Sequence, residues 1–300
     1  MGNTVLLGIG LGLGAAFFQS LSYICIRRFN NRHDDNIIAL LALSHILMGL
    51  ISIPLAGWLW PESMPPLSSY GLSLLGTSGF YLLGQFFLFA AIIHSEPSRV
   101  SPLLGLKVFI LAMISVVFLN QHLNTSKWVA VILTTAAVLL LSHSGKRLEG
   151  RFILPGLLAC LSYCLSDLCI KVLVDHFAFL GILRGAVLAT ALSYIVCGIF
   201  GAVVVALNPK HSTRDTWLYA VPFAISWFLA MICLFSCFGL VGVVFGNILQ
   251  STRGMLSIVL GFVIAHIGFE ALEPKPSMRI IVQRLVAAVL MTGAVVLFLK

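Results

Sequence analysis

The sequence predicts an all-α membrane protein with ten transmembrane helices. Its mean hydropathy is +1.06 and only 9% of its 300 residues are charged, which is too little charge for the mixed polar surface of a soluble domain. Ten apolar stretches are separable, and most reach the roughly 20 residues that a helix needs to cross about 30 Å of hydrocarbon. Apolar and polar residues do not alternate with period 2, which argues against a barrel of strands.

The predicted helices are joined by short polar connections. None of these connections is long enough for a folded extramembrane domain, and no Gly-rich phosphate loop with a following Lys-Ser or Lys-Thr is present, so nucleotide-driven transport by this chain alone has no support. The ten stretches are residues 4–25, 36–58, 69–93, 99–119, 127–143, 152–174, 179–207, 215–237, 240–266 and 280–299.

Part of the sequence is repeated. The segment Ser-Tyr-Ile-Cys-Ile-Arg at 22–27 matches Ser-Asp-Leu-Cys-Ile-Lys at 166–171, which lies 144 residues later, and residues 128–141 align with 284–297 at an offset of 156. Internal duplication is typical of secondary transporters, whose binding sites lie between the repeats. We therefore divide the chain into a first five-helix repeat, residues 1–146, and a second, residues 147–300.

Two cations lie deep in apolar stretches, at roughly equivalent positions of the two repeats: Lys107, about eight residues into the fourth stretch, and Arg253, near the middle of the ninth. A cation at the bilayer centre costs about 2.5–3.5 kcal/mol on insertion scales, so each should face a wet cavity or an anionic partner. One interpretation is that they hold a carboxylate or phosphate of a substrate, with Arg253 suited to a two-pronged contact. The other is that they bond to carbonyls freed near Pro102, or to buried carboxylates, and only hold the bundle together.

Polar side chains at helical spacing supply further candidates, although hydrogen bonds between helices also explain such residues. Asp167 and Lys171 have the i,i+4 spacing of a salt bridge, which is the structural alternative to a substrate contact by Asp167. The candidate substrate-binding residues are Lys107, Arg253, Gln19, Tyr23, Gln85, Tyr163, Asp167, Asn247 and Gln250.

Several motifs accompany the two repeats: the Gly/Ala-rich first and sixth stretches, residues 98–103 (Ser-Arg-Val-Ser-Pro-Leu), residues 250–254 (Gln-Ser-Thr-Arg-Gly) and the segments that close each half. In these motifs the chain resembles the ten-helix EamA-type members of the drug/metabolite transporter superfamily, and this resemblance covers nearly the whole chain. It implies two inverted five-helix repeats around a central cavity lined mostly by helices 1, 3, 4, 6, 8 and 9. Family members often carry Glu after the fourth helix of each half, whereas this chain has Gln121 in the first half and only His266 or Glu270 nearby in the second.

These observations predict a secondary active transporter that works by alternating access on a small polar, acid-bearing metabolite such as an amino acid or organic acid. Export is expected from the resemblance alone. A membrane-embedded lipid-modifying enzyme would need a concentrated acid/base or metal cluster, and a channel would need a subunit ring or filter sequence. Because His33, Asp34 and Asp35 adjoin without a second cluster, we predict no enzymatic activity, catalytic residue, metal site or cofactor.

The expected partners are the small-molecule substrate and membrane lipids, with the protein as a monomer or homodimer in a bacterial cytoplasmic (inner) membrane. Nucleic acid is not expected, because the net charge of +8 includes no basic stripe interleaved with aromatic residues. Coupling, if present, is expected to use protons, since His45, Asp167, His266 and Glu270 are titratable and the sequence has no clear oxygen-rich sodium site.

Overall fold

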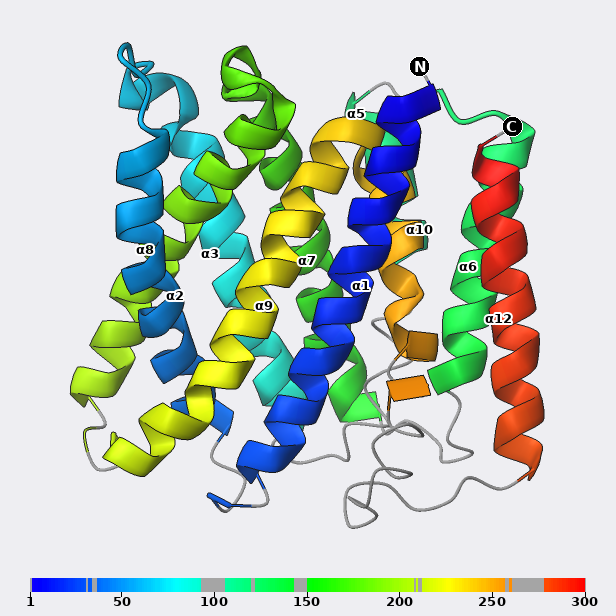
Figure 1. Cartoon of the computed structure of the whole chain (residues 1–300). Helices are drawn as coiled ribbons and strands as arrows, with labels where there is room; N and C mark the ends of the chain where they lie inside the picture. Colours follow the sequence, from blue (N-terminus) through cyan, green and yellow to red (C-terminus); the bar gives the residue numbers. More distant parts are fainter. Residues whose placement is uncertain are drawn as a thin grey trace.

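A computed structural model describes residues 2–30, 32–33, 37–92, 106–119, 122–142, 150–207, 209, 212–256, 259–260 and 278–299. The regular secondary structure in these ranges is helical, and the helices stand roughly side by side as one bundle (Figure 1). The first turn of the first helix and the last turn of the last helix lie at the same end of the bundle (Figure 1).

Every predicted apolar stretch overlaps a described helix, so the positions of the helices follow the hydropathy of the sequence. The helices are α1 (Gly2–Asn30), α2 (Ile37–Leu59), α3 (Leu67–Ile92), α5 (Lys107–Leu119), α6 (Thr125–Ser142), α7 (Gly150–His176), the 3-10 turn η1 (Ala178–Leu180), α8 (Ile182–Leu207), α9 (Arg214–Val241), α10 (Val243–Ser251) and α12 (Met278–Phe298).

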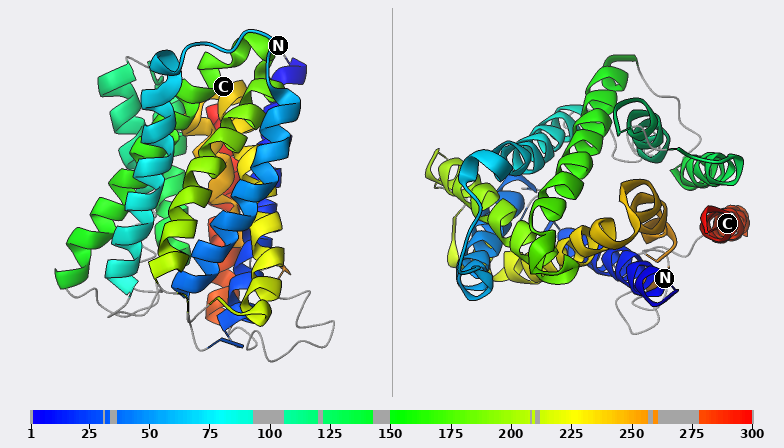
Figure 2. Two further views of the ribbon diagram at one scale, coloured as in Figure 1. Left: turned by 90° about the vertical axis from the view of Figure 1, so that its left-hand side faces the viewer. Right: turned by 90° about the horizontal axis from the view of Figure 1, so that it is seen from above.

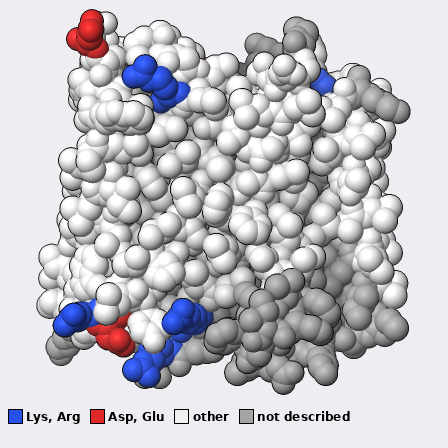
Figure 3. Space-filling model, viewed as in Figure 1, with Lys and Arg blue, Asp and Glu red and all other residues white. Residues whose placement is uncertain are grey.

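The outer surface of the bundle is suited to lipid. Within the described ranges, the helices α1, α2, α3, α7, α8 and α9 each contain a segment long and apolar enough to cross a membrane, and shorter apolar helices lie at residues 107–117, 125–141 and 285–298. On the face drawn in Figure 3, the coloured charged side chains lie near the two ends, with an uncharged band between them. The chain is therefore an integral, multi-pass membrane protein.

The helices pack in pairs that are far apart in the sequence. The most extensive contacts join α1 to α9, α3 to α7, α2 to α8 and α6 to α12. Seen from above, α6 and α12 stand next to one another at one edge of the bundle (Figure 2). There Gln283 of α12 donates a hydrogen bond to the carbonyl of Leu140 in α6.

Two backbones approach closely where α2 and α8 cross. A Cβ added to Gly49 would lie 3.0 Å from the Cα of Gly198 and 3.1 Å from the carbonyl oxygen of Tyr194. A Cβ added to Gly198 would lie equally close to Gly49 and to the carbonyl oxygen of His45. Small residues allow such approach in membranes, where packing and interhelical hydrogen bonds replace the hydrophobic effect between helices.

A single glycine joins α9 to α10. Gly242 has φ of +82° and its N–H donates to the carbonyl of Phe238, a backbone conformation that residues with a Cβ rarely adopt. The neighbouring glycines serve close packing, since a Cβ at Gly246 would meet the Phe238 ring at 2.5 Å and one at Gly239 would meet Ile182 at 2.8 Å. The turn places α10 against both α9 and α1.

We expect Gly49→Val to lower the thermal stability of the purified protein substantially. The new side chain would meet the α8 backbone, which can move only by separating the two helices, and overpacking typically costs about 1–3 kcal/mol. The matched control is Gly57→Val on the same helix, where an added Cβ meets nothing within 4 Å. Thermal unfolding in detergent measures both variants, and equal melting temperatures for the two would contradict the assigned role of this crossing.

Candidate functional site

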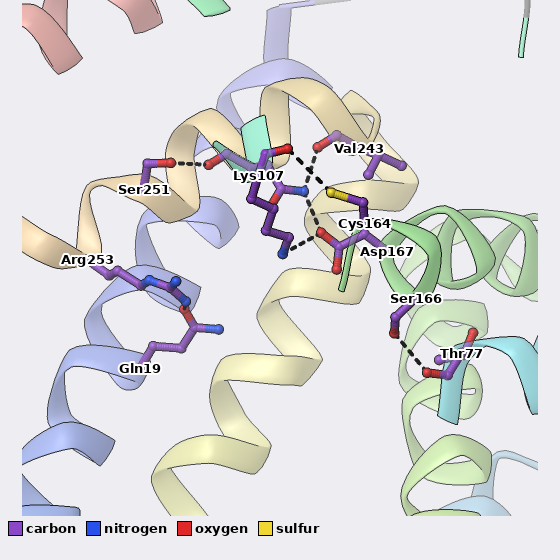
Figure 4. A network of polar contacts seen from close by, with 10 residues as sticks. Gln19, Thr77, Lys107, Cys164, Ser166, Asp167, Val243, Ser251 and Arg253 are labelled. Atoms are coloured by element: carbon purple, nitrogen blue, oxygen red, sulfur yellow. Dashed lines mark hydrogen bonds and ion pairs between the residues drawn. The ribbon is translucent and has the colours of Figure 1, made fainter. Parts of the chain in front are cut away.

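A buried ion pair connects three helices in the interior of the bundle. The Lys107 Nζ lies 2.7 Å from Asp167 Oδ2, and Asn247 Nδ2 donates to the same oxygen at 2.8 Å (Figure 4). Asn247 also donates to the carbonyl of Val243, one turn earlier on α10, at 3.0 Å. The start of α5, the middle of α7 and the middle of α10 are thereby tied together at one carboxylate.

This carboxylate is well shielded from the surroundings. The side chains of Lys107 and Asp167 are 14% and 7% exposed, and Asn247 is 1% exposed. A charge in such a place is tolerated only when paired, because losing its hydration costs several kcal/mol. Asn247 supplies a charge-assisted hydrogen bond without adding charge, so the three side chains form one electrostatic unit.

The expected bridge between Asp167 and Lys171 is not formed. Lys171 Nζ instead donates to both oxygens of Asp175, at 2.5 and 2.6 Å, and this second pair is more exposed. The i,i+4 rule applies to both spacings along α7. The tertiary structure selects between them, because Asp167 faces α5 and α10 while Asp175 lies on an exposed turn of the helix.

The second central cation is bound to α1. Arg253 Nη1 donates to Gln19 Oε1 at 3.1 Å (Figure 4), and Gln19 is only 1% exposed. Arg253 follows Thr252, where α10 ends. Both predicted cations are therefore in the interior with polar partners, and Figure 4 shows the two groups in the same region between α1, α7 and α10.

Two residues that the sequence reasoning did not select hold the backbone of these cations. Ser20 Oγ on α1 lies 2.9 Å from the carbonyl oxygen of Arg253 and 2.7 Å from that of Ala16, so the two carbonyls share its proton. Cys164 on α7 donates to the carbonyl of Lys107 at 3.5 Å. Ser20 and Cys164 are 144 positions apart, which is the offset of the repeated segment. Comparing each polar residue of the first stretch with the residue 144 positions later would have identified Ser20 and Cys164 as a matching pair.

The remaining candidates lie on the helices around these groups. Tyr163 is one turn before Asp167 on α7, and its ring centroid is 6.5 Å from that of Tyr81 on α3. Gln85 follows Tyr81 by one turn, Tyr23 follows Gln19 by one turn on α1, and Gln250 is buried on α10. The five side chains that form the ion-pair group and the Arg253–Gln19 contact all belong to the predicted set, and these four residues complete it on α1, α3, α7 and α10.

A further contact between α3 and α7 lies next to the ion pair. Ser166, the neighbour of Asp167, donates to the carbonyl of Thr77 at 2.8 Å (Figure 4). Several predicted positions, namely residues 98–103, Gln121, His266 and Glu270, lie outside the described residues. Within the described part of the chain, no group of three or more His, Cys, Asp or Glu side chains could hold a metal ion.

Comparison with known proteins agrees with this architecture. Residues 6–143, a little under half of the chain, match the model of the EamA-like transporter family, and the resemblance predicted from the sequence is confirmed. A membrane transporter is the class that this match indicates.

One solved structure, described only as the crystal structure of a protein, is similar over 98% of this chain and 96% of its own, with a TM-score of 0.69 and 16% sequence identity. At that identity the likeness shows the fold alone, but it extends over both halves of the chain. A search of curated proteins found no match.

Removing either partner of the buried pair should destabilise the protein more than removing both. We expect Lys107→Met and Asp167→Asn each to lower the free energy of unfolding, by up to about 3–5 kcal/mol when a charge is left alone. The double variant Lys107→Met/Asp167→Asn should recover much of that loss, because neither charge remains. Unfolding in detergent followed by tryptophan fluorescence measures the four corners of this cycle.

The matched control for that cycle is the exposed pair. Lys171→Met and Asp175→Asn should each change stability by about 0–1 kcal/mol, as surface ion pairs do. If the double variant at Lys107 and Asp167 lost as much unfolding free energy as the two single variants together, the two charges would not depend on each other.

Proposed function

We propose that this protein is a secondary active transporter that exports a small polar, acid-bearing metabolite, such as an amino acid or organic acid, by alternating access. The observation that carries the proposal is the pair of cationic groups in the bundle interior: Lys107 held by Asp167 and Asn247, and Arg253 held by Gln19. A purely structural bundle gains little from keeping two cations away from lipid headgroups and water, since intramembrane charges are costly and mark functional sites.

We further propose that the fold is ten helices in two inverted five-helix repeats, residues 1–146 and 147–300. The pairing of helices supports this division. If the first helix of each repeat corresponds to α1 and α7, the second to α2 and α8 and the third to α3 and α9, then the pairs α1 with α9 and α3 with α7 are equivalent. The pairs α2 with α8 and α6 with α12 each map onto themselves, as a two-fold axis requires.

The hydrogen bonds of the two cations support the same division. Lys107 and Arg253 are 146 positions apart, and each backbone carbonyl accepts from the first helix of the opposite repeat, through Cys164 and Ser20 respectively. The side chains then differ. Lys107 of the first repeat is bound by Asp167 of the second. The position that corresponds to Asp167 in the first repeat, 144 residues earlier, is Tyr23, and Arg253 is bound by the neutral Gln19.

The guanidinium of Arg253 supports a substrate that carries an acidic group. A guanidinium binds a carboxylate through two parallel hydrogen bonds, and a substrate carboxylate in place of Gln19 Oε1 would be a charged acceptor instead of a neutral one. The attraction strengthens as water is excluded. Lys107 can also bind the substrate carboxylate when an ammonium group of the substrate takes its place at Asp167. A zwitterionic substrate would therefore provide partners for the cations and for Asp167.

Alternating access follows from the division into repeats. The two halves would rock about the central groups, and the flexible positions would include Pro54 within α2 and Gly242 between α9 and α10. The same proposal includes export as the direction of transport, the bacterial cytoplasmic (inner) membrane as the location, and a monomer or homodimer as the oligomeric state. It also includes substrate contacts by Tyr23, Gln85, Tyr163 and Gln250.

The direct test is transport by the purified protein in lipid vesicles. Radiolabelled amino acids and organic acids should exchange across vesicles that contain the protein, and purely cationic amines should not. We expect Arg253→Gln to lower transport of the acid-bearing substrate at least tenfold, because a charged hydrogen bond to the substrate contributes about 1.5–3 kcal/mol. Arg253→Lys should retain part of the activity, since it keeps the charge and loses the fork.

The control for this test is Arg184→Gln, which removes an exposed arginine near the start of α8 and should transport normally. All variants are compared at equal amounts of folded protein in the vesicles. Full transport by Arg253→Gln, or rapid uptake of a cation without an acidic group, would refute the proposed charge selectivity.

Coupling to protons is the second expectation for this assay. Asp167 is the described carboxylate at the central site, and its protonation would release Lys107. Imposing a pH gradient should drive accumulation of the substrate, and Asp167→Asn should abolish this drive while leaving substrate exchange measurable. Transport that persists when the pH gradient is collapsed and stops when sodium is removed would contradict proton coupling.

A further inference from the structure

The end of α1 and the start of α9 form a charged surface at the end of the bundle opposite to the chain termini (Figure 1). Arg28 and Arg32 are one turn apart at the end of α1 and just beyond it, and Asp215 and Tyr219 are one turn apart on α9. The Arg32 Nε lies 3.7 Å from Asp215 Oδ2, and the Arg28 guanidinium carbon lies 5.5 Å from the centroid of the Tyr219 ring. These four residues and Arg214 are called the arginine patch below.

Aromatic rings join the two helices next to the patch. The His33 ring, in the turn after α1, has its centroid 4.6 Å from that of Phe29 on α1 and 5.4 Å from that of Tyr219 on α9. Its Nε2 is 3.6 Å from Asp215 Oδ2. Phe29 is fully buried, and the contact between α1 and α9 is among the most extensive in the bundle. The arginines therefore extend from two helices that are packed firmly against each other.

The patch carries more positive than negative charge. Arg28, Arg32 and Arg214 are exposed, and the Arg32 side chain is 65% exposed even though it contacts Asp215. In the described part of the chain, Arg28 contacts a ring face and no carboxylate. A ring that stacks on a guanidinium covers one face and leaves the N–H groups at the edge available. On the face drawn in Figure 3, basic side chains flank an acidic one at the lower edge, so the patch has donors left for an anionic ligand.

A tryptophan places the patch at the level of lipid headgroups. Trp217 lies three residues after Arg214, and its indole N–H donates to Ser212 Oγ at 2.9 Å. Trp and Tyr side chains gather where membrane meets water, because their rings are apolar and carry a polar tip. At the opposite end of the bundle, the exposed Trp58 and Trp60 occupy the corresponding level at the end of α2 and just beyond it.

We propose that the arginine patch is a binding site for the phosphate group of an anionic phospholipid, such as phosphatidylglycerol. A guanidinium binds a phosphate through two parallel hydrogen bonds, and a lipid with a net negative charge neutralises the excess charge of the patch. A zwitterionic lipid also has a phosphate, but its own ammonium group competes with the arginines for that phosphate. The inference does not depend on what the protein transports.

A lipid bound at the patch connects the two halves of the chain. The helix α1 lies in the first half and α9 in the second, so a phosphate shared by arginines of both helices adds a contact between the halves. A ligand that binds only the folded protein stabilises it as the ligand concentration rises above the dissociation constant. Anionic lipid should therefore raise the unfolding temperature, and less so in high salt, which screens exposed charges.

The test is native mass spectrometry of the purified protein, titrated with phosphatidylglycerol or phosphatidylcholine of the same acyl chains. We expect Arg28→Gln/Arg32→Gln to weaken the tightest phosphatidylglycerol binding about 25-fold, at about fivefold for each basic residue, and to leave phosphatidylcholine binding unchanged. Arg28→Lys/Arg32→Lys should lose less, since the charges remain and only the fork is lost. The matched control is Lys127→Gln/Arg184→Gln, which removes two cations where α6 and α8 begin, at the opposite end of the bundle (Figure 1).

Removing the acidic residue of the patch should act in the opposite direction. In Asp215→Asn the phosphate no longer competes with a carboxylate for Arg32, so phosphatidylglycerol should bind up to about fivefold tighter. Asp175→Asn removes the same charge from an exposed aspartate at the end of α7 and should leave the tightest binding unchanged. The unfolding temperatures of these proteins in phosphatidylglycerol nanodiscs, relative to phosphatidylcholine nanodiscs, are expected to follow the same order.

Equal affinity for the two lipids, or equal losses in Arg28→Gln/Arg32→Gln and in the Lys127→Gln/Arg184→Gln control, would overturn the proposal, because binding would then not depend on the patch. Inorganic phosphate that raised the unfolding temperature as much as phosphatidylglycerol would also overturn it and assign the site to soluble phosphate. Should the Arg28→Gln/Arg32→Gln protein fail to fold, Arg214→Gln alone is expected to weaken phosphatidylglycerol binding about fivefold, and unchanged binding would contradict the site. None of these measurements involves transport, so their failure would leave the proposed function unaffected.

Discussion

The structure depends on the cost of placing a charge away from water. Lys107 and Asp167 are both shielded inside a protein whose surroundings are hydrocarbon, and each is tolerable only because the other is 2.7 Å away. Their pairing fixes the start of α5 against α7, and Asn247 brings α10 to the same carboxylate. The short α10, the turn at Gly242 that precedes it and the position of Arg253 that follows it all conform to this arrangement.

Close packing of backbones makes the arrangement possible. The glycines at the α2 and α8 crossing let two helices approach without side chains between them, and the polar groups beside that crossing are satisfied across the interface rather than by solvent. Under the proposed division into repeats, corresponding positions carry different chemistry: Ser20 and Cys164 contact the carbonyls of Arg253 and Lys107, and His45 and Tyr194 accept hydrogen bonds from Tyr81 and Trp227. A transporter of this design would need halves similar enough to exchange conformations and different enough to bind an asymmetric substrate.

Hydropathy sufficed to locate the helices because a membrane requires every spanning segment to be apolar and internally hydrogen-bonded. The inward position of Lys107 and Arg253 was predictable for the same reason. The ion-pair partners of these residues and of Asp167 were not predictable from the sequence. The i,i+4 spacing favoured Lys171 for Asp167, but Lys171 binds Asp175 and Asp167 binds Lys107, 60 positions away in the sequence. His45 was a candidate proton carrier, and the structure gives both of its ring nitrogens hydrogen-bond partners on α2 and α3.

The sequence by itself determined the solvent, the approximate helix ends, the repeated segments and the residues too polar to face lipid, because these depend on composition and on residues near one another in the chain. Only the tertiary structure decided which carboxylate neutralises Lys107, that Gln19 binds Arg253, and that His45 and Tyr194 meet beside a glycine crossing. Those outcomes depend on the rotation and depth of helices from opposite halves, and a polar side chain in a low-dielectric interior bonds with whichever partner that packing brings within about 3 Å.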